Sequence, residues 1–201
     1  MTHYKDYQAK PLFAERINSL ISDEKDRAEY WKIIRTRPRA SLRCNTLKIS
    51  PENLKARLKD KGWEIEQPFS DNKEIMIVTS QLKPGELGKA IEHILGYYYV
   101  QEISSMLPII ALNPSSKDIV LDLCASPGSK TTQASSFMNN SGCLIANDKD
   151  IGRIAILQAN LERVGASNVI MTRHDAVQLC LRLEKLGIKF DKILLDVPCS
   201  G

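Results

Sequence analysis

A cysteine that follows a proline near the end of the sequence is the first candidate for chemistry. It is Cys199, in the segment DVPCSG (residues 196–201). One chemistry that needs a thiol beside a methyl donor is methylation of carbon 5 of a pyrimidine. A thiolate adds to carbon 6, the resulting enamine attacks the methyl group, and loss of the carbon-5 proton releases the product. An acid and a cation assist by moving protons and stabilising charge, and Asp196 and Lys130 are the candidates.

The segment VLDLCASPGSKTTQ (residues 120–133) is the strongest candidate for a ligand site. An apolar strand is followed by a turn of small residues that opens a helix. Ser126, Gly128 and Ser129 let a ligand approach the main chain, and a helix N-terminus favours a negative group such as the carboxylate of a methionine moiety. The segment is neither GxGxxG nor a Walker loop, so a dinucleotide or a nucleoside triphosphate is less expected. The alternative is a purely structural turn.

Acidic residues follow the other predicted strands. Asp148 lies about 20 residues beyond the turn, where folds of this kind place an acid that accepts hydrogen bonds from ribose hydroxyls. Asp175 can accept a hydrogen bond from an adenine amino group. Each of the two can instead be a helix N-cap. Together with Asp122 and Asp196, they are predicted to form the rim of one crevice.

The elements that position these residues alternate regularly after the turn-forming residues 113–116. Strands are predicted at residues 119–123, 143–147, 169–172 and 192–196, and helices at 129–138, 151–164 and 176–186. Short strands alternating with helices predict an α/β fold in which a parallel sheet is covered on both faces. Ligands of such folds bind at the carboxyl ends of the strands.

The residues before this boundary predict a different arrangement. One or two amphipathic helices are expected over residues 13–34. A small α+β module follows, with strands at 41–47, 63–66, 74–79 and 97–101 and helices at 52–59, 86–95 and 103–112. Ser50 and Pro51 are the cap and first turn of the helix at 52–59, and Gly62 ends it. The predicted domains are therefore residues 1–40, 41–112 and 113–201.

Basic residues are concentrated between Lys32 and Lys48, where no acidic residue occurs, although the net charge of the chain is only +4. A local positive field of this kind suits phosphates. The alternative is an ordinary solvated basic face. The residues predicted to contact RNA are Arg35, Arg37, Arg39, Arg43 and Lys48.

Composition excludes several classes of protein. The chain has 201 residues, of which 43% are hydrophobic, and it can bury a sizeable core. It contains no run approaching the roughly 20 apolar residues of a membrane span, and its polar start is unlike a secretion signal, so the cytoplasm is the expected location. The five cysteines include no CxxC pair, and the three histidines lack metal-binding spacing, so neither a disulfide framework nor a metal site is expected. Cys180 is expected to pack on a helical apolar face.

Five segments resemble the Nop/Sun family of RNA 5-methylcytosine methyltransferases, the group that includes proteins of the RsmB and RsmF type. They are DLCASPGSKT, the AND of residues 146–148 with Arg153 beyond it, DVPCSG, SLRCNTLK (residues 41–48) and YYYVQEISSMLP (residues 97–108). The resemblance implies a Rossmann-like class I methyltransferase domain, of which the first four parallel strands are present, preceded by a small α+β RNA-binding module. It also implies S-adenosylmethionine as the cofactor and RNA as the substrate. The GSKTTQ variant favours tRNA over rRNA.

The resemblance assigns roles to individual residues. Contacts to S-adenosylmethionine are implied at Cys124, Ala125, Ser126, Pro127, Gly128, Ser129, Lys130, Asp148, Arg153, Asp175 and Asp196. Lys130 and Asp196 are also implied to lie near the reacting base.

One departure from the family concerns the nucleophile. In this family the attacking cysteine belongs to a later Thr-Cys motif, which would lie beyond residue 201, and the Pro-Cys cysteine, here Cys199, assists release of the covalent adduct. Three further strands of the usual sheet are also missing, which leaves the fourth strand as an edge with an uncovered apolar face. We therefore expect the chain alone to be inactive and poorly soluble, with the remainder cut off or supplied as a second polypeptide. The alternatives are a non-catalytic RNA- or cofactor-binding fragment and a methyltransferase that acts on another atom, which would have no use for Cys199.

Overall fold

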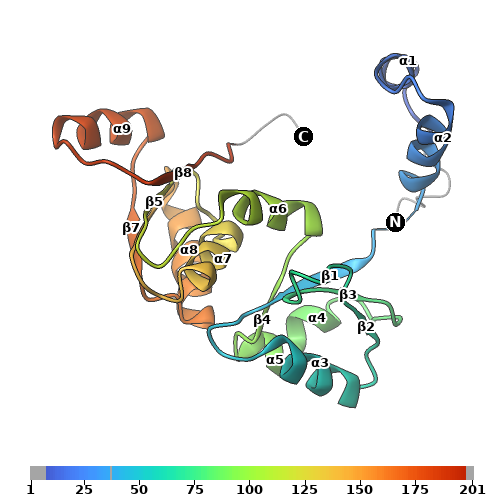
Figure 1. Cartoon of the computed structure of the whole chain (residues 1–201), viewed down its shortest axis with the longest axis horizontal. Coiled ribbons are helices and arrows are strands. Elements are labelled where there is room, and N and C mark those ends of the chain that lie inside the picture. Colours follow the sequence, from blue (N-terminus) through green and yellow to red (C-terminus); the bar gives the residue numbers. More distant parts are fainter. Residues whose placement is uncertain (1–7, 37, 198–201) are drawn as a thin grey trace. The chain divides into compact units, whose positions relative to one another are not determined.

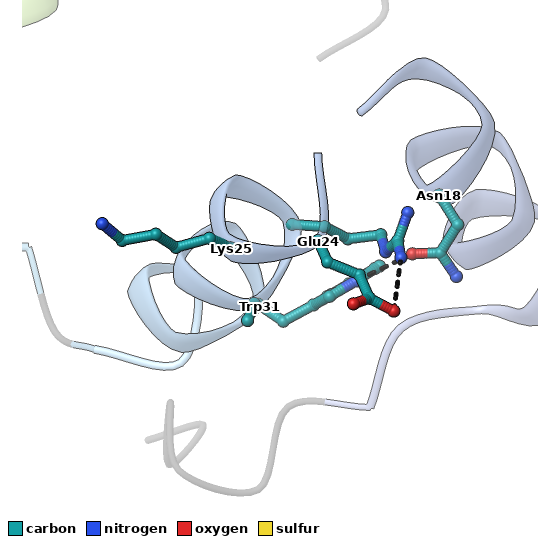
Figure 2. Close-up of a pocket in the computed structure, with 6 residues that line it drawn as sticks. Asn18, Glu24, Lys25 and Trp31 are labelled. Atoms are coloured by element: carbon teal, nitrogen blue, oxygen red, sulfur yellow. Dashed lines mark hydrogen bonds and ion pairs between the residues drawn. The ribbon is translucent and has the colours of Figure 1, made fainter. Parts of the chain in front are cut away.

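The computed structural model describes residues 8–36 and 38–197, which divide into two compact units between Arg39 and Ala40. The first unit contains the helices α1 (Pro11–Leu20) and α2 (Glu24–Ile33), as predicted (Figure 1). The Asp23 side chain caps α2, and the Trp31 indole donates a hydrogen bond to Asn18 Oδ1 at 3.0 Å. Figure 2 shows Asn18 and Trp31 in a pocket of this unit. None of the predicted site residues lines this pocket.

The second unit begins with a four-stranded antiparallel sheet in the order β2-β3-β1-β4. Its strands are β1 (Ala40–Cys44), β2 (Ile65–Glu66), β3 (Ile75–Val78) and β4 (Tyr98–Val100), and its long helix is α3 (Pro51–Asp60). Ser50 caps α3 and Pro51 occupies its first turn, as the sequence predicts. A core that includes Leu42, Leu54 and Tyr98 joins α3 to this sheet.

The single helix predicted over residues 86–95 is wrong. The chain forms two short helices, α4 (Glu86–Lys89) and α5 (Ile91–Ile94), separated by the extended residue Ala90. The Tyr98 hydroxyl donates a hydrogen bond to the carbonyl oxygen of Leu87. In a continuous helix that carbonyl would accept from the amide four residues later, so the tertiary contact replaces a helical one.

The second sheet is parallel, in the order β7-β6-β5-β8. Its strands are β5 (Ile119–Asp122), β6 (Cys143–Asn147), β7 (Val169–Thr172) and β8 (Lys192–Leu194), and its helices are α6 (Ile103–Leu112), α7 (Ser129–Phe137), α8 (Ile151–Val164) and α9 (Ala176–Lys185). Val120 and Leu144 pack with residues of α6 and α7, whereas Leu121 packs with α9 on the opposite face. The predicted parallel sheet with helices on both faces is therefore confirmed.

Among the described residues, strand β8 is an edge of this sheet, because it pairs there only with β5. The Ile193 side chain on this strand is 53% exposed, and Leu195 and Val197 beyond it are exposed as well. An apolar edge of this kind was predicted for the fourth strand. The expectation that Cys180 packs is wrong, because Cys180 is exposed. The buried face of α9 is formed by Leu179 and Leu183, which pack against the sheet.

The predicted domain boundary at residue 113 falls in the connection between α6 and β5. Both sheets belong to the same compact unit, which starts at Ala40. The division into residues 1–40, 41–112 and 113–201 stays a prediction. Within residues 8–36 and 38–197, no helix combines the length and the apolar character needed to cross a membrane.

Candidate active site

The last residue of the turn between β5 and α7 has a left-handed backbone conformation, which glycine adopts more easily than other residues. Gly128 has a φ of +102° and is the N-cap of α7. A Cβ at this position would lie 2.9 Å from Leu157 Cδ1 in α8. The turn is fixed to the neighbouring strand because the Ala125 amide donates a hydrogen bond to the Asn147 carbonyl at 2.8 Å. The small residues predicted to let a ligand approach therefore form a rigid turn.

Asp148 lies at the centre of a hydrogen-bonded network beside this turn. The residue is only 6% exposed, and its carboxylate accepts from Arg153 Nε at 3.1 and 3.2 Å and from the Ser126 amide at 3.3 Å. Arg153 also donates to the Ser126 carbonyl at 2.6 Å. The cap of α8 is Asp150, whose side chain accepts from the Arg153 amide. The alternative reading of Asp148 as a helix cap is therefore wrong.

Asp175 has the capping role that the sequence left open. Its side chain accepts from the amides of Val177 and Gln178 at the start of α9, and it pairs with Lys149 at 3.3 Å. The hydrogen bond from Lys149, followed by those from the backbone, lowers the pKa of Asp175. Asp175 nevertheless faces the same cavity as Asp148, so capping does not exclude a ligand contact.

A cavity of about 590 Å³ opens at the carboxyl ends of β5, β6 and β7. Its lining includes Cys124, Asp148, Arg153 and Asp175, four of the residues predicted to bind the cofactor. Burial raises the pKa of the Cys124 thiol, which keeps it protonated near neutral pH. The size and the polar rim suit a ligand of nucleoside dimensions.

The sequence placed Asp122 on the rim of the crevice, and this prediction is wrong. Asp122 lies beneath the turn and does not line the cavity. It is 2% exposed and accepts from Thr131 Oγ1 at 2.7 Å and from the Cys124 amide. Its other oxygen, Oδ1, has no hydrogen-bond partner within the described residues. Burial raises the pKa of this carboxyl to about 6. A buried acceptor without a donor costs stability, and such groups are concentrated at functional sites.

Replacing Asp122 by asparagine should increase the free energy of unfolding at pH 7 by about 1–3 kcal/mol. The folded pKa of about 6 exceeds the ordinary value of 3.8, so the folded protein binds more protons and its stability falls as the pH rises from 3.8 to 6. Urea denaturation at pH 4.5 and 7 measures this slope, which the variant should lose. An unchanged slope would contradict the assignment.

Asp118→Asn is the matched control for this measurement. Hydrogen bonds from Ser115 hold the pKa of Asp118 below its usual range, so this carboxylate contributes stability that is lost as the pH falls. Its removal should therefore change the pH dependence in the opposite sense to the removal of Asp122.

Lys130 and Asp196, the two residues predicted to assist catalysis, form an ion pair. Lys130 Nζ lies 2.6 Å from Asp196 Oδ2, and their side chains are 14% and 56% exposed. Lys130 belongs to the first turn of α7, and Asp196 follows β8, so the pair connects the turn with the fourth strand. Neither residue lines the cavity, so among the predicted rim acids only Asp148 and Asp175 do. Cys199 lies outside the described residues.

Four of the five basic residues predicted to contact RNA lie within the described residues, and they divide between the two compact units. Arg43 is buried, with its guanidinium bound to protein groups, so the prediction that it contacts RNA is wrong. Lys48 is exposed, but its ammonium donates to the carbonyls of Leu95 and Arg163. Arg35 and Arg39 are exposed in the other compact unit, and Arg37 lies outside the described residues. Within residues 8–36 and 38–197, no cluster of His, Cys, Asp and Glu could hold a metal ion.

Two family models cover nearly the whole chain. The model described as 16S rRNA methyltransferase RsmB/F matches residues 109–201, and the model of the N-terminal domain of 16S rRNA methyltransferase RsmF matches residues 10–103. The chain belongs to the RsmB/F methyltransferase family. This is the Nop/Sun group that the sequence motifs indicated, so the resemblance is confirmed. The family depends on S-adenosylmethionine, the cofactor predicted from the sequence.

Relatives with known names agree with this assignment. "Ribosomal RNA small subunit methyltransferase F" from Photobacterium profundum is 41% identical over 192 residues, which are 94% of this chain and 40% of the relative. The chain thus spans about 40% of the length of this relative. The crystal structure of a methyltransferase homologue from Pyrococcus horikoshii matches 96% of this chain and 65% of its own, with 32% identity and a TM-score of 0.73.

A second solved structure shares the fold. NSun6 from Pyrococcus horikoshii, described as solved with SFG, is 23% identical and has a TM-score of 0.78. The match covers 94% of this chain and 71% of that one. The Rossmann-like methyltransferase fold expected for this family is confirmed.

The sequence analysis gave no individual role to two residues of the candidate site. Asn147 is buried and donates to the carbonyls of Leu123 and His174, while its Oδ1 accepts from Thr172 Oγ1 and the His174 amide. It therefore joins the carboxyl ends of β5, β6 and β7. The available signal was a polar residue at the end of an apolar strand, directly before Asp148. His174, one of the three histidines without metal-binding spacing, also lines the cavity.

Proposed function

We propose that this chain binds S-adenosylmethionine and, together with the remainder of the enzyme, methylates carbon 5 of a cytosine in RNA. The observation that carries the proposal is the Lys130–Asp196 ion pair, with its nitrogen and oxygen 2.6 Å apart. It joins the turn proposed to bind the cofactor with the strand that leads into DVPCSG. A cofactor turn and a base-handling motif are thus held at the same edge of one sheet.

The residues at this edge fit S-adenosylmethionine. The cofactor supplies a methyl group on a positively charged sulfur. Asp148 would accept hydrogen bonds from the ribose hydroxyls, and Arg153 holds that carboxylate in place. Asp122 Oδ1, which has no donor within the described residues, lies beneath the turn, where the negative charge of the carboxylate would attract the ammonium group of a methionine moiety. Contacts are also proposed for residues 124–130 and for Asp175 and Asp196.

Lys130 and Asp196 are proposed to act on the cytosine. Lys130 is largely buried, which strengthens its electrostatic effect on negative charge that develops in the ring. Asp196 is more exposed and can exchange a proton with the base. The attacking thiol is proposed to lie beyond residue 201, with Cys199 assisting release of the adduct.

The substrate we propose is RNA of the small ribosomal subunit. The relative from Photobacterium profundum and several others are named for this RNA, which favours rRNA over the tRNA suggested by the GSKTTQ variant. An enzyme with this substrate would work in the cytoplasm.

The second candidate function is a non-catalytic fragment that binds S-adenosylmethionine or RNA. It is kept because this chain spans about 40% of the length of the Photobacterium profundum relative, so the activity of that whole protein draws on residues that this chain does not contain. The two candidates differ in whether supplying the rest of the enzyme restores methyl transfer.

The test is to combine this chain with the C-terminal part of the Photobacterium profundum relative and small-subunit rRNA labelled with tritium at carbon 5 of cytosine. We expect the chain alone to bind S-adenosylmethionine in calorimetry, and the combination to transfer methyl groups and release tritium to water. Binding without transfer would favour the fragment. Transfer without tritium release would show that another atom is methylated. A chain that does not bind S-adenosylmethionine would overturn the proposal.

A further inference from the structure

A buried arginine of the first sheet reaches the helix that follows the proposed cofactor turn. Arg43 on β1 is 2% exposed, and its Nη1 donates to the Ser129 carbonyl at 2.8 Å. Its Nη2 donates to Thr132 Oγ1, also at 2.8 Å, and Nη1 also donates to Gln101 Oε1. Ser129 and Thr132 are in the first turn of α7. A residue 86 positions earlier in the chain thus holds the start of this helix.

Among the described residues, the charge of Arg43 is not neutralised in an ion pair, although the nearby Glu74 raises its pKa. None of the ion pairs within residues 8–36 and 38–197 includes Arg43, and its Nε has no hydrogen-bond partner there. Burial lowers the pKa of Arg43 to about 10, which leaves the guanidinium charged at neutral pH. The face of the Tyr99 ring, whose centroid is 5.5 Å away, gives partial compensation.

Considered by itself, a cation at this position destabilises helix α7. A helix N-terminus already carries partial positive charge, so a buried cation in the first turn is unfavourable unless an anion is nearby. The cation therefore raises the positive potential at residues 124–128, where the carboxylate of a methionine moiety would lie in the proposed function. An anion bound there would offset part of the cost of burying this cation.

We propose that Arg43 is a positioning residue of the cofactor site, which fixes the first turn of α7 and favours the carboxylate end of S-adenosylmethionine. This inference rests on the proposed function. The first sheet holds the turn from a second point, because the Tyr99 hydroxyl donates to the Pro127 carbonyl at 3.4 Å. In this proposal the segments SLRCNTLK and YYYVQEISSMLP help to build the cofactor site through Arg43 and Tyr99.

The test compares two ligands in calorimetry with this chain. S-adenosylmethionine carries the carboxylate, whereas 5′-methylthioadenosine lacks the whole amino-acid end. Arg43→Met should weaken the binding of S-adenosylmethionine about tenfold and change that of 5′-methylthioadenosine less than about twofold. Arg43→Lys keeps the charge but cannot reach both acceptors, so it should weaken S-adenosylmethionine about threefold without affecting the other ligand.

Arg57→Met is the matched control. Arg57 on α3 lies 5.5 Å from the centroid of the Tyr97 ring and pairs with Glu92 at 3.7 Å, within the first sheet and its helices. Its loss should lower the melting temperature and leave both affinities unchanged.

Equal losses for the two ligands in the Arg43 variants, or no loss for S-adenosylmethionine, would overturn the inference. If Arg43→Met does not fold, Arg43→Lys decides the question by the same comparison. Failure of the unaltered chain to bind either ligand would instead overturn the proposed function.

Discussion

Replacing Lys130 by methionine should reduce the rate of methyl transfer about a thousandfold at saturating S-adenosylmethionine. Methionine keeps most of the side-chain volume but removes the charge that lies 2.6 Å from Asp196. The cytosine would then build up negative charge next to an unpaired carboxylate, which is repulsive. The rate is measured with this chain combined with the C-terminal part of its relative. Calorimetry should show that the affinity for the cofactor falls less than about threefold, because the proposed site assigns cofactor binding mainly to Asp148.

Lys192→Met is the matched control for this effect. Lys192 also pairs with an aspartate, Asp118, at 3.5 Å, but at the opposite end of the sheet. Its ammonium donates to the carbonyls of Leu112 and Asn113, so its loss should lower the melting temperature and leave the transfer rate unchanged. A Lys130 variant that retains a tenth or more of the rate would remove this lysine from the proposed chemistry.

The elements of the parallel sheet could be predicted from the sequence because local signals determine their limits. The helix α8 and the strands β6 and β7 have the bounds expected from apolar periodicity and from the turn-forming residues between them. The break between α4 and α5 could not be predicted in this way. It depends on the Tyr98 hydroxyl, a contact from a later strand that no local pattern contains.

The candidate site was predictable in its types of residue but not in their depth. A strand followed by small residues and a helix indicates where a turn lies. Asp148 after the next strand indicates an acceptor for the ribose of a ligand. Whether a charged residue is exposed depends on the packing of distant segments. Arg43 therefore reads as part of a basic surface, and Asp122 as part of a rim, although α7 covers both with hydrogen-bonding partners. The pairing of Lys130 with Asp196 likewise required the sheet order β5-β8.

Replacing Asp148 by asparagine should weaken the binding of S-adenosylmethionine about a hundredfold, which corresponds to about 3 kcal/mol. The carboxylate offers two acceptor oxygens near the cavity, and Arg153 and the Ser126 amide hold them in place. Asparagine has the same shape, but its NH₂ group replaces one acceptor oxygen. This group would face Arg153, the Ser126 amide or the ribose hydroxyls, which are donors as well. Unlike the Arg43 variants, Asp148→Asn should weaken 5′-methylthioadenosine to a similar extent, because that ligand retains the ribose.

Measuring the free energy of unfolding of the Asp148 variant distinguishes a loss of binding from a loss of folding. Arg153 is about half exposed, so its ion pair with Asp148 is screened by solvent, and the free energy of unfolding should change by less than about 1 kcal/mol. Asp118→Asn is the matched control, since Asp118 is a similarly covered carboxylate at the opposite end of β5 and should leave both ligands unaffected. An Asp148 variant that binds both ligands as tightly as the unaltered chain would mean that the ribose is not held here. The cavity at the carboxyl ends of β5, β6 and β7 would then need another ligand to explain why an acid is buried beside it.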